Sequence, residues 1–196
     1  MKTIISITAI ILLSISCKKL LDRAVQGDTL VVDGFSEYVI DSGAHYTNGN
    51  GYKAISNTKS IHFIAWFDST CIYKSVDPNN QGDINKLYGF SDCNTTHQES
   101  SARVGWSWNG HSFDLYAYCY VNSLRQSKLL GSIKPRERTD LTIAIGDNKY
   151  HFTMNGRVVS MDRECSTPTI EGYQLYPYFG GDEVAPHAMR IYIKEL

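Results

Sequence analysis

The feature that most constrains the fold is a pair of alternating apolar runs joined by Asn109-Gly110. Ala102–Trp108 carries apolar side chains at every second position, and Ser112–Asn122 does the same. Alternation with a period of two buries one face of a strand and leaves the other face free. The Asn-Gly pair supplies the positive φ angles that a tight turn requires. The two runs therefore predict an antiparallel β-hairpin with one buried face.

Short runs of the same kind recur along the chain, and turn residues separate them. They are Thr29–Val32, Glu37–Ile40, Ser60–Phe67, Lys86–Phe90, Leu141–Ile145, Lys149–Met154, Arg157–Met161 and Met189–Lys194. No stretch of about ten residues or more keeps the apolar period of a capped helix. The 13 Tyr, 7 Phe and 15 Gly agree with this pattern, because aromatic residues favour strands and glycine favours turns. We therefore expect an all-β fold, an antiparallel β-sandwich or jelly roll.

The N-terminus resembles the export signal of a bacterial lipoprotein. Ile4–Ile15 is apolar but has only about a dozen residues, whereas a membrane-spanning helix needs about 20. Ser16-Cys17 resembles a lipobox, in which the cysteine is lipidated and becomes the new N-terminus. Ser14 stands where a lipobox more often has leucine, so cleavage by an ordinary signal peptidase is the alternative. We expect lipidation of Cys17, because several acyl chains anchor a protein stably to a bilayer.

This signal sets the expected organisation of the chain. Residues 1–16 are the predicted signal peptide, 17–28 a lipidated tether, and 29–196 a single β-sandwich domain. After Cys17 the sequence reads Lys18-Lys19-Leu20-Leu21, without the acidic cluster that resembles a surface-export signal. We therefore expect an exported outer-membrane lipoprotein on the periplasmic face.

The charge balance bears on the partners. With 19 Lys and Arg against 20 Asp and Glu and no basic stripe, the sequence does not predict nucleic-acid binding. The expected partners are a polysaccharide or glycan and, through the lipid anchor, a membrane. The oligomeric state is not determined by the sequence.

Four cysteines remain beyond Cys17, and an even number in an exported chain makes two disulfides possible. The preferred pairing joins Cys71 to Cys93 and Cys119 to Cys165, since each bond closes a loop of moderate length. Buried free thiols are the alternative. No CxxC or HxxxH spacing indicates a zinc site.

Three segments resemble known jelly-roll proteins. Trp106–Tyr116 and Lys149–Gly156 are similar to late hairpins of the concanavalin A-like lectin and glucanase superfamily. Tyr176–His187 resembles the end of exported jelly-roll lipoproteins of Bacteroidetes. The resemblance extends over about Ser60 to Leu196 and implies a concanavalin A-like jelly roll. It does not determine the activity, because this scaffold carries lectins, hydrolases, lyases and adhesive domains alike.

The chain departs from the enzymes of that superfamily. Its glucanases carry an E-x-D-x-x-E strand, and glycoside hydrolysis needs two carboxyl groups at a defined separation. The adjacent acids Asp182-Glu183 would point to opposite faces of a strand. Jelly-roll alginate lyases carry a Q-x-H strand, which is absent here. We therefore lean towards a chain without enzymatic activity.

The candidate ligand-binding residues are aromatic and polar side chains of the predicted middle strands. They are Arg103, Trp108, Tyr116, Tyr118, Tyr120 and His151. Aromatic rings and hydrogen-bonding groups suit sugar rings, although the same aromatics could simply fill the core. The tyrosines lie opposite Leu115 and Ala117, which already supply a core face, so the tyrosine face should be free.

These residues support three functional readings. The preferred one is a membrane-anchored lipoprotein with a non-catalytic glycan- or surface-binding domain. The second is a polysaccharide lyase or glycoside hydrolase, with His151 as base and Arg103 as charge neutraliser beside a tyrosine. The third is a structural or protein-interaction domain. Ca²⁺ binding at Asp182 and Glu183 is a weaker prediction, set against a solvated turn, and no other cofactor is expected.

Overall fold

The computed structural model describes residues 23–26 and 29–196 of the chain. The predicted signal peptide, residues 1–16, and the predicted lipidation site at Cys17 lie outside the described residues, so both stay predictions. Within the described part, no helix is long and apolar enough to cross a membrane.

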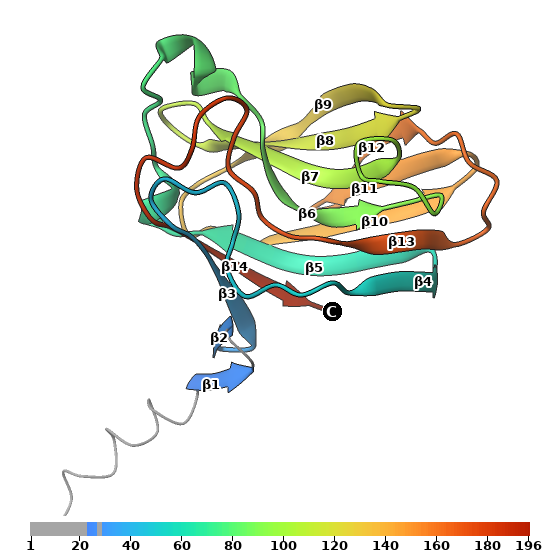
Figure 1. The fold of residues 1–196 in the computed structure, drawn as a ribbon, viewed down its shortest axis with the longest axis horizontal. Helices are drawn as coiled ribbons and strands as arrows, with labels where there is room; N and C mark the ends of the chain where they lie inside the picture. Colours follow the sequence, from blue (N-terminus) through green and yellow to red (C-terminus); the bar gives the residue numbers. More distant parts are fainter. Residues whose placement is uncertain (1–22, 27–28) are drawn as a thin grey trace, which may run out of the picture.

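The described chain forms two antiparallel sheets that pack face to face, which confirms the predicted β-sandwich (Figure 1). The eight-stranded sheet has the order β1 (Arg23–Gln26), β2 (Thr29–Val32), β3 (Phe35–Ile40), β14 (Met189–Glu195), β5 (Ser60–Phe67), β10 (Thr139–Gly146), β11 (Lys149–Met154) and β12 (Arg157–Asp162). The six-stranded sheet has the order β4 (Ala54–Thr58), β13 (Ile170–Leu175), β6 (Asn85–Ser91), β7 (Ser101–Trp108), β8 (Phe113–Val121) and β9 (Leu124–Ile133). Two short 3₁₀ helices, η1 (Ser69–Cys71) and η2 (Pro78–Gly82), connect β5 to β6.

The core lies between the two sheets and follows the alternation in the sequence. On β7 and β8, Trp106 and Phe113 are fully buried, and they meet Phe67 of β5 from the opposite sheet. The ring centroids of Phe67 and Phe113 are 4.7 Å apart, and those of Phe67 and Trp106 are 5.0 Å apart. Burying a side chain of this size contributes about 1.5–3 kcal/mol. The predicted hairpin, with its buried face towards the core, is confirmed.

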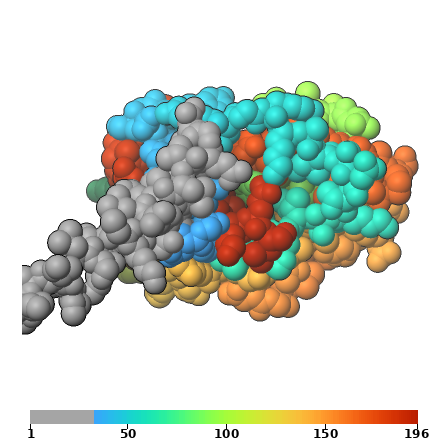
Figure 2. All heavy atoms as spheres, turned by 90° about the horizontal axis from the view of Figure 1, so that it is seen from below, coloured from blue at the N-terminus to red at the C-terminus, as the bar shows by residue number. Residues whose placement is uncertain are grey.

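The C-terminal strand β14 lies inside the eight-stranded sheet, between β3 and β5. Figure 2 shows the last residues in red between the blue N-terminal segments and the teal segments that follow them. Ile191 pairs with Tyr38 of β3 and with Phe67 of β5. The two ends of the domain sequence are therefore neighbours in the fold.

Four strands lie where the sequence pattern does not predict one, and each has a physical reason. Strand β1 lies within the predicted tether and is too short to show a period. Strands β4 and β9 are the two edges of the six-stranded sheet, and only Leu130 and Ile133 of β9 are buried. In β13 the register shifts between Ile170 and Gly172. A Cβ atom on Gly172 would lie 2.2 Å from the carbonyl oxygen of Ser91, so this close approach requires glycine.

The predicted disulfide pairing is wrong. The bond joins Cys93 to Cys165, whose Cα atoms are 5.8 Å apart, and Cys71 and Cys119 are free and fully buried. Cys119 lies on the core face of β8, whereas Cys93 and Cys165 lie in loops outside the strands, and it is the two loop cysteines that pair. Burial raises the pKa of both free thiols, which keeps them protonated.

Candidate functional site

A groove runs over the outer face of the six-stranded sheet, with a volume of about 360 Å³. We call it the Arg103 groove. The strands contribute Lys86, Ser101, Arg103, Tyr118, Tyr120, Gln174 and Leu175. The connecting segments contribute Tyr46, Thr47, Asn50, His97, Gln98, Tyr176, Pro177 and Tyr178. Cationic and aromatic side chains thus line the Arg103 groove, and no carboxylate is among its lining residues.

The position of Arg103 follows from the register of three strands. It pairs with Gly89 of β6 on one side and with Tyr118 of β8 on the other. A Cβ atom at Gly89 would lie 2.1 Å from the carbonyl oxygen of Ala102 and 2.8 Å from Cγ of Arg103. Glycine at this position therefore lets the arginine side chain lie close against the sheet.

Replacement of Gly89 with alanine should therefore disturb Arg103 directly. The added methyl group would meet backbone of β7, and overpacking of this kind costs about 1–3 kcal/mol. Urea unfolding of G89A should show that loss, whereas G82A, where a Cβ atom would meet nothing within 4 Å, serves as the matched control. Equal stability of the two variants would contradict the close approach.

Arg103 is a buried cation without an ionic partner. The residue is 7% exposed, and none of the described carboxylates lies within ion-pair distance of its guanidinium. Nη2 donates to the carbonyl oxygen of Tyr176 over 2.6 Å, and Nε is buried with no hydrogen-bond partner. Burial lowers the pKa of Arg103 to about 10, which still leaves it charged near neutral pH. A buried, unpaired charge is costly, so this position suits an anionic ligand.

Lys86 is the second cation in the Arg103 groove. Its backbone bridges to Tyr178 through two hydrogen bonds of 2.9 Å. Nζ donates to the carbonyl oxygen of Gly180 over 2.7 Å and lies 5.4 Å from the ring centroids of both Tyr118 and Tyr178. Burial, followed by the charges of Arg103 and Arg125, lowers the pKa of Lys86 to about 8.

Tyr118 lies beside both cations and remains protonated. It is 3% exposed, and its ring centroid is 6.0 Å from that of Tyr120. Burial raises the pKa of Tyr118, and a hydrogen bond with Tyr120 raises it further. The phenol can therefore donate a proton or a hydrogen bond throughout the neutral pH range.

His97 reaches the Arg103 groove from the loop between β6 and β7. Its backbone N–H donates to the hydroxyl oxygen of Tyr173 over 3.2 Å, and its Nδ1 lies 3.0 Å from the same oxygen. Burial lowers the pKa of His97, and the charge of Arg103 adds to this effect. The imidazole is therefore neutral near neutral pH.

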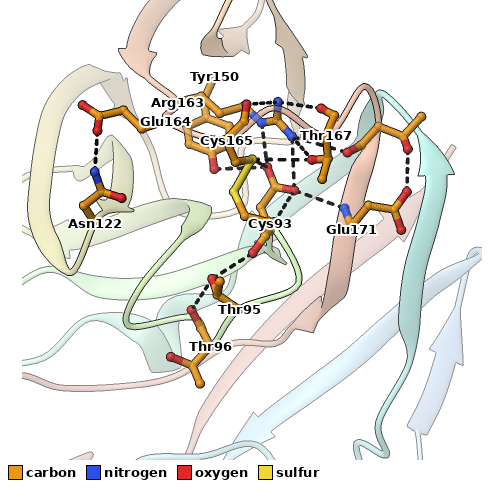
Figure 3. The surroundings of a disulfide bond; sticks show 12 residues. Cys93, Thr95, Thr96, Asn122, Tyr150, Arg163, Glu164, Cys165, Thr167 and Glu171 are labelled. Carbon is orange, nitrogen blue, oxygen red and sulfur yellow. Dashed lines mark hydrogen bonds and ion pairs between the residues drawn. A yellow bond between two sulfur atoms is a disulfide. The ribbon is translucent and has the colours of Figure 1, made fainter.

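The base of that loop is clamped to the rest of the domain (Figure 3). Asp92, which is fully buried, accepts from Nε of Arg163 over 2.7 Å and from the hydroxyl of Tyr150 over 3.1 Å. The adjacent Cys93 forms the disulfide with Cys165. We call the hydrogen bonds that Asp92 accepts from Arg163 and Tyr150 the Asp92 clamp. It fixes the loop that carries His97.

The structure brings together three of the residues that the sequence singled out. Arg103, Tyr118 and Tyr120 all line the Arg103 groove. Tyr116 lies on the same strand but outside the groove lining, where its hydroxyl is 3.2 Å from Oγ of Ser107. Trp108 instead packs on the core, with its ring centroid 4.9 Å from that of Phe113.

The structure does not bring His151 to the Arg103 groove. His151 lies on β11 of the opposite sheet, where its ring nitrogens are 2.9 Å from Oγ of Ser160 and 3.1 Å from the carbonyl oxygen of Gly146. The alternation of apolar and polar residues shows which face of its strand a side chain occupies. It does not show which strands belong to the same sheet. His151 and Arg103 therefore do not form the predicted base and neutraliser pair.

Sequence reasoning missed most of the other groove residues. Lys86 starts an apolar run, and its charge within that run is a signal that could have been noticed. His97, Gln174 and Tyr178 come from segments far apart in the chain, and only the fold brings them to the Arg103 groove.

The acids proposed for Ca²⁺ lie away from the Arg103 groove. The carboxylate of Glu183 accepts from the backbone N–H groups of Val76 and Asp77 over 2.8 Å each and from Nδ2 of Asn80 over 3.0 Å. These hydrogen bonds lower the pKa of Glu183 and join its loop to η2. Asp182 is exposed. Ca²⁺ binding here stays a prediction.

Comparison with solved structures gives the fold. An alginate lyase of polysaccharide lyase family 7 from Zobellia galactanivorans is 11% identical, with a TM-score of 0.56 over 87% of this chain and 79% of that one. A non-specific endo-β-1,3(4)-glucanase of family GH16 is 8% identical, with a TM-score of 0.55 over 84% and 71%. A protein from work on endo-acting O-glycanases of the human gut microbiota is 10% identical, with a TM-score of 0.58 over 88% and 85%. No protein-family model and no curated protein sequence matches the chain. The fold is the concanavalin A-like jelly roll, as the resemblance implied.

These comparisons correct the preferred functional reading. The solved structures of the same fold are mostly alginate lyases, together with a glucanase. They favour the enzymatic alternative over a non-catalytic glycan-binding domain. The absence of the Q-x-H and carboxylate motifs argued against an enzyme in the sequence analysis. A groove whose residues come from separate segments of the chain has no short sequence motif, so that absence does not exclude an active site.

Proposed function

We propose that this protein is a polysaccharide lyase that cleaves an acidic, uronate-containing polysaccharide by β-elimination in the Arg103 groove. The observation that carries the proposal is the buried, unpaired guanidinium of Arg103 on the floor of a groove without carboxylates. A uronate carboxylate would supply the missing anion. It would accept hydrogen bonds from a cation that is already desolvated, and such bonds are stronger than those between neutral groups.

The proposed chemistry depends on that ion pair. Elimination removes the proton on C5, next to the uronate carboxylate, and the negative charge spreads onto the carboxylate oxygens. Cationic donors fixed beside those oxygens stabilise the transition state without having to reorganise. Arg103 is held in this way by the strand register and by its hydrogen bond to Tyr176.

The same groove does not suit glycoside hydrolysis. Retaining and inverting hydrolases of the common type need two carboxyl groups on either side of the bond that is cleaved. Lys86, Arg103, His97 and tyrosines line the groove instead. The alginate lyases among the structural neighbours act on a polymer of uronates, which supports the same class of substrate.

A panel of polysaccharides tests the proposal. The domain is incubated with alginate, pectate, glucuronan and hyaluronan, and with neutral laminarin as the control. We expect ultraviolet absorbance from a new C4=C5 double bond with at least one acidic polymer and none with laminarin. New reducing ends without that absorbance would indicate hydrolysis and overturn the proposal.

Replacement of Arg103 with methionine should separate activity from stability. We expect a loss of activity of about 10²–10³-fold, because a preorganised cationic donor is removed. Removing a buried, unpaired charge should also stabilise the fold by about 1–2 kcal/mol, which raises the melting temperature by about 2–4 °C per kcal/mol. Arg157→Met, at an exposed position on β12 of the opposite sheet, is the charge-matched control. An R103M variant with full activity would exclude Arg103 as the neutralising group.

A further inference from the structure

The lyase chemistry needs a base, and the Arg103 groove contains an amine placed for that role. We infer that Lys86 is the general base that takes the C5 proton, which makes it a catalytic residue of this chain. The inference rests on the proposed lyase function and goes beyond it, because it assigns a lysine to the proton transfer.

The geometry places Lys86 beside the neutralising group. Lys86 pairs with Gly105, which lies two residues from Arg103 on β7 and therefore faces the same side of the sheet. Nζ lies between the rings of Tyr118 and Tyr178, 5.4 Å from each centroid. Lys86 and Arg103 line the same groove, so a uronate bound with its carboxylate on Arg103 would share that groove with the amine.

The groups around Lys86 act on its charge in both directions, and together with burial they lower its pKa. Arg103 on β7 and Arg125 on β9 repel its positive charge, and burial disfavours that charge more strongly than either of them. Asp83, at the end of η2, acts in the opposite direction. The rings of Tyr118 and Tyr178, whose centroids lie 5.4 Å from Nζ, and the carbonyl oxygen of Gly180, 2.7 Å from Nζ, also favour the ammonium form. Burial outweighs these groups, and the pKa of Lys86 is lowered to about 8. A fraction of the amine is therefore unprotonated near neutral pH, as a base must be.

His97 is less well placed for the same step. Its backbone N–H donates to the hydroxyl oxygen of Tyr173, and its Nδ1 is engaged with the same oxygen over 3.0 Å. These two contacts tie the ring to Tyr173. We therefore assign His97 to substrate binding and the proton transfer to Lys86, and the Lys86 variants test this assignment.

The step balances in protons and electrons. The lone pair of the neutral Nζ takes the C5 proton, the electrons of the C5–H bond form the C4=C5 double bond, and the C4–O bond breaks. The departing glycosidic oxygen takes the phenolic proton of Tyr118. The ammonium of Lys86 then returns a proton to the Tyr118 phenolate through solvent. No water, oxidant or reductant is consumed.

Substitution of Lys86 combined with amine rescue tests the inference. The acidic polymer that gives unsaturated product with the wild-type domain is used with K86R, K86A and the exposed control K128A. We expect K86R, which keeps the charge but has no neutral form, to lose about 10²–10⁴-fold in kcat with KM changed by less than about threefold. Methylamine should restore activity to K86A but not to K86R. A purely structural lysine would not produce that rescue.

The pH profile provides a second measurement. In the wild type, kcat/KM should fall as the pH drops below about 8, because Lys86 becomes protonated there. In K86A with a series of primary amines, that limb should move with the pKa of the added amine. Full kcat in K86R, or no amine rescue of a folded K86A, would overturn the inference. If the wild type gives no unsaturated product from any polymer, the lyase proposal itself fails, and the two failures are thus distinguishable.

Discussion

Replacement of Asp92 with alanine should lower the free energy of unfolding by about 3–5 kcal/mol, because it leaves the guanidinium of Arg163 buried without a partner. Asp92 is fully buried and Arg163 is 6% exposed. The carboxylate also accepts backbone N–H groups of Cys93 over 2.8 Å and Glu171 over 3.1 Å, so several donors would lose their acceptor at once. Urea unfolding followed by tryptophan fluorescence measures the change.

Two further variants separate the ion pair from the loss of packing. In D92A/R163M no charge is buried, so a large part of the lost stability should return. Lys149→Ala breaks the exposed pair between Lys149 and Asp162, and should destabilise the fold far less than D92A, because exposed ion pairs contribute little to stability. If D92A were no more destabilising than K149A, the Asp92 clamp would not be holding the fold.

Removal of the disulfide should have an effect of similar size. The Cys93–Cys165 bond closes a loop with a sequence separation of 72, for which the chain-entropy relation gives about 4 kcal/mol. The variant C93S/C165S should therefore unfold at a clearly lower urea concentration than the wild type. Reduction of the disulfide with dithiothreitol should lower the urea midpoint of the wild type to that of the variant. The midpoint of the variant should not change.

The activity of that variant is a further part of this prediction. The disulfide at Cys93 holds the base of the loop that carries His97 into the Arg103 groove. Loss of the bond makes this loop more mobile, so we expect KM for the polysaccharide to rise by a larger factor than kcat falls. The measurement is made well below the unfolding midpoint. Unchanged stability on reduction would contradict the structural role of the bond.

Much of the fold could be predicted from the sequence, because strand alternation is a local property. Ser60–Phe67 and Lys149–Met154 are predicted with the same bounds that β5 and β11 have, because the first is a mostly apolar run of strand length and the second alternates apolar and polar residues. Strand β9 could not be found in this way, because most of its side chains lie at an exposed sheet edge. Alternation of apolar and polar residues arises when one face of a strand is buried, and an edge strand that is largely exposed lacks this alternation.

The candidate site could be predicted only in part. Arg103 and Tyr118 were identified because they alternate against a core face within one hairpin. Lys86 and His97 lie on other segments, and nothing local indicates that those segments meet. The same limit explains the wrong disulfide pairing, since sequence separation does not tell a loop cysteine such as Cys93 from a core cysteine such as Cys119.

The place of β14 between β3 and β5 has a consequence for the order of folding. Strand β14 is synthesised after all the other described strands, and until it has left the ribosome β3 and β5 have no neighbour on the sides where they will pair with β14. A nascent chain can form the hairpin of β7 and β8 early, but it cannot complete the eight-stranded sheet. Pairing between strands so distant in sequence is slow, and open strand edges associate readily with other chains. The nascent protein is therefore most vulnerable to aggregation just before β14 becomes available to pair.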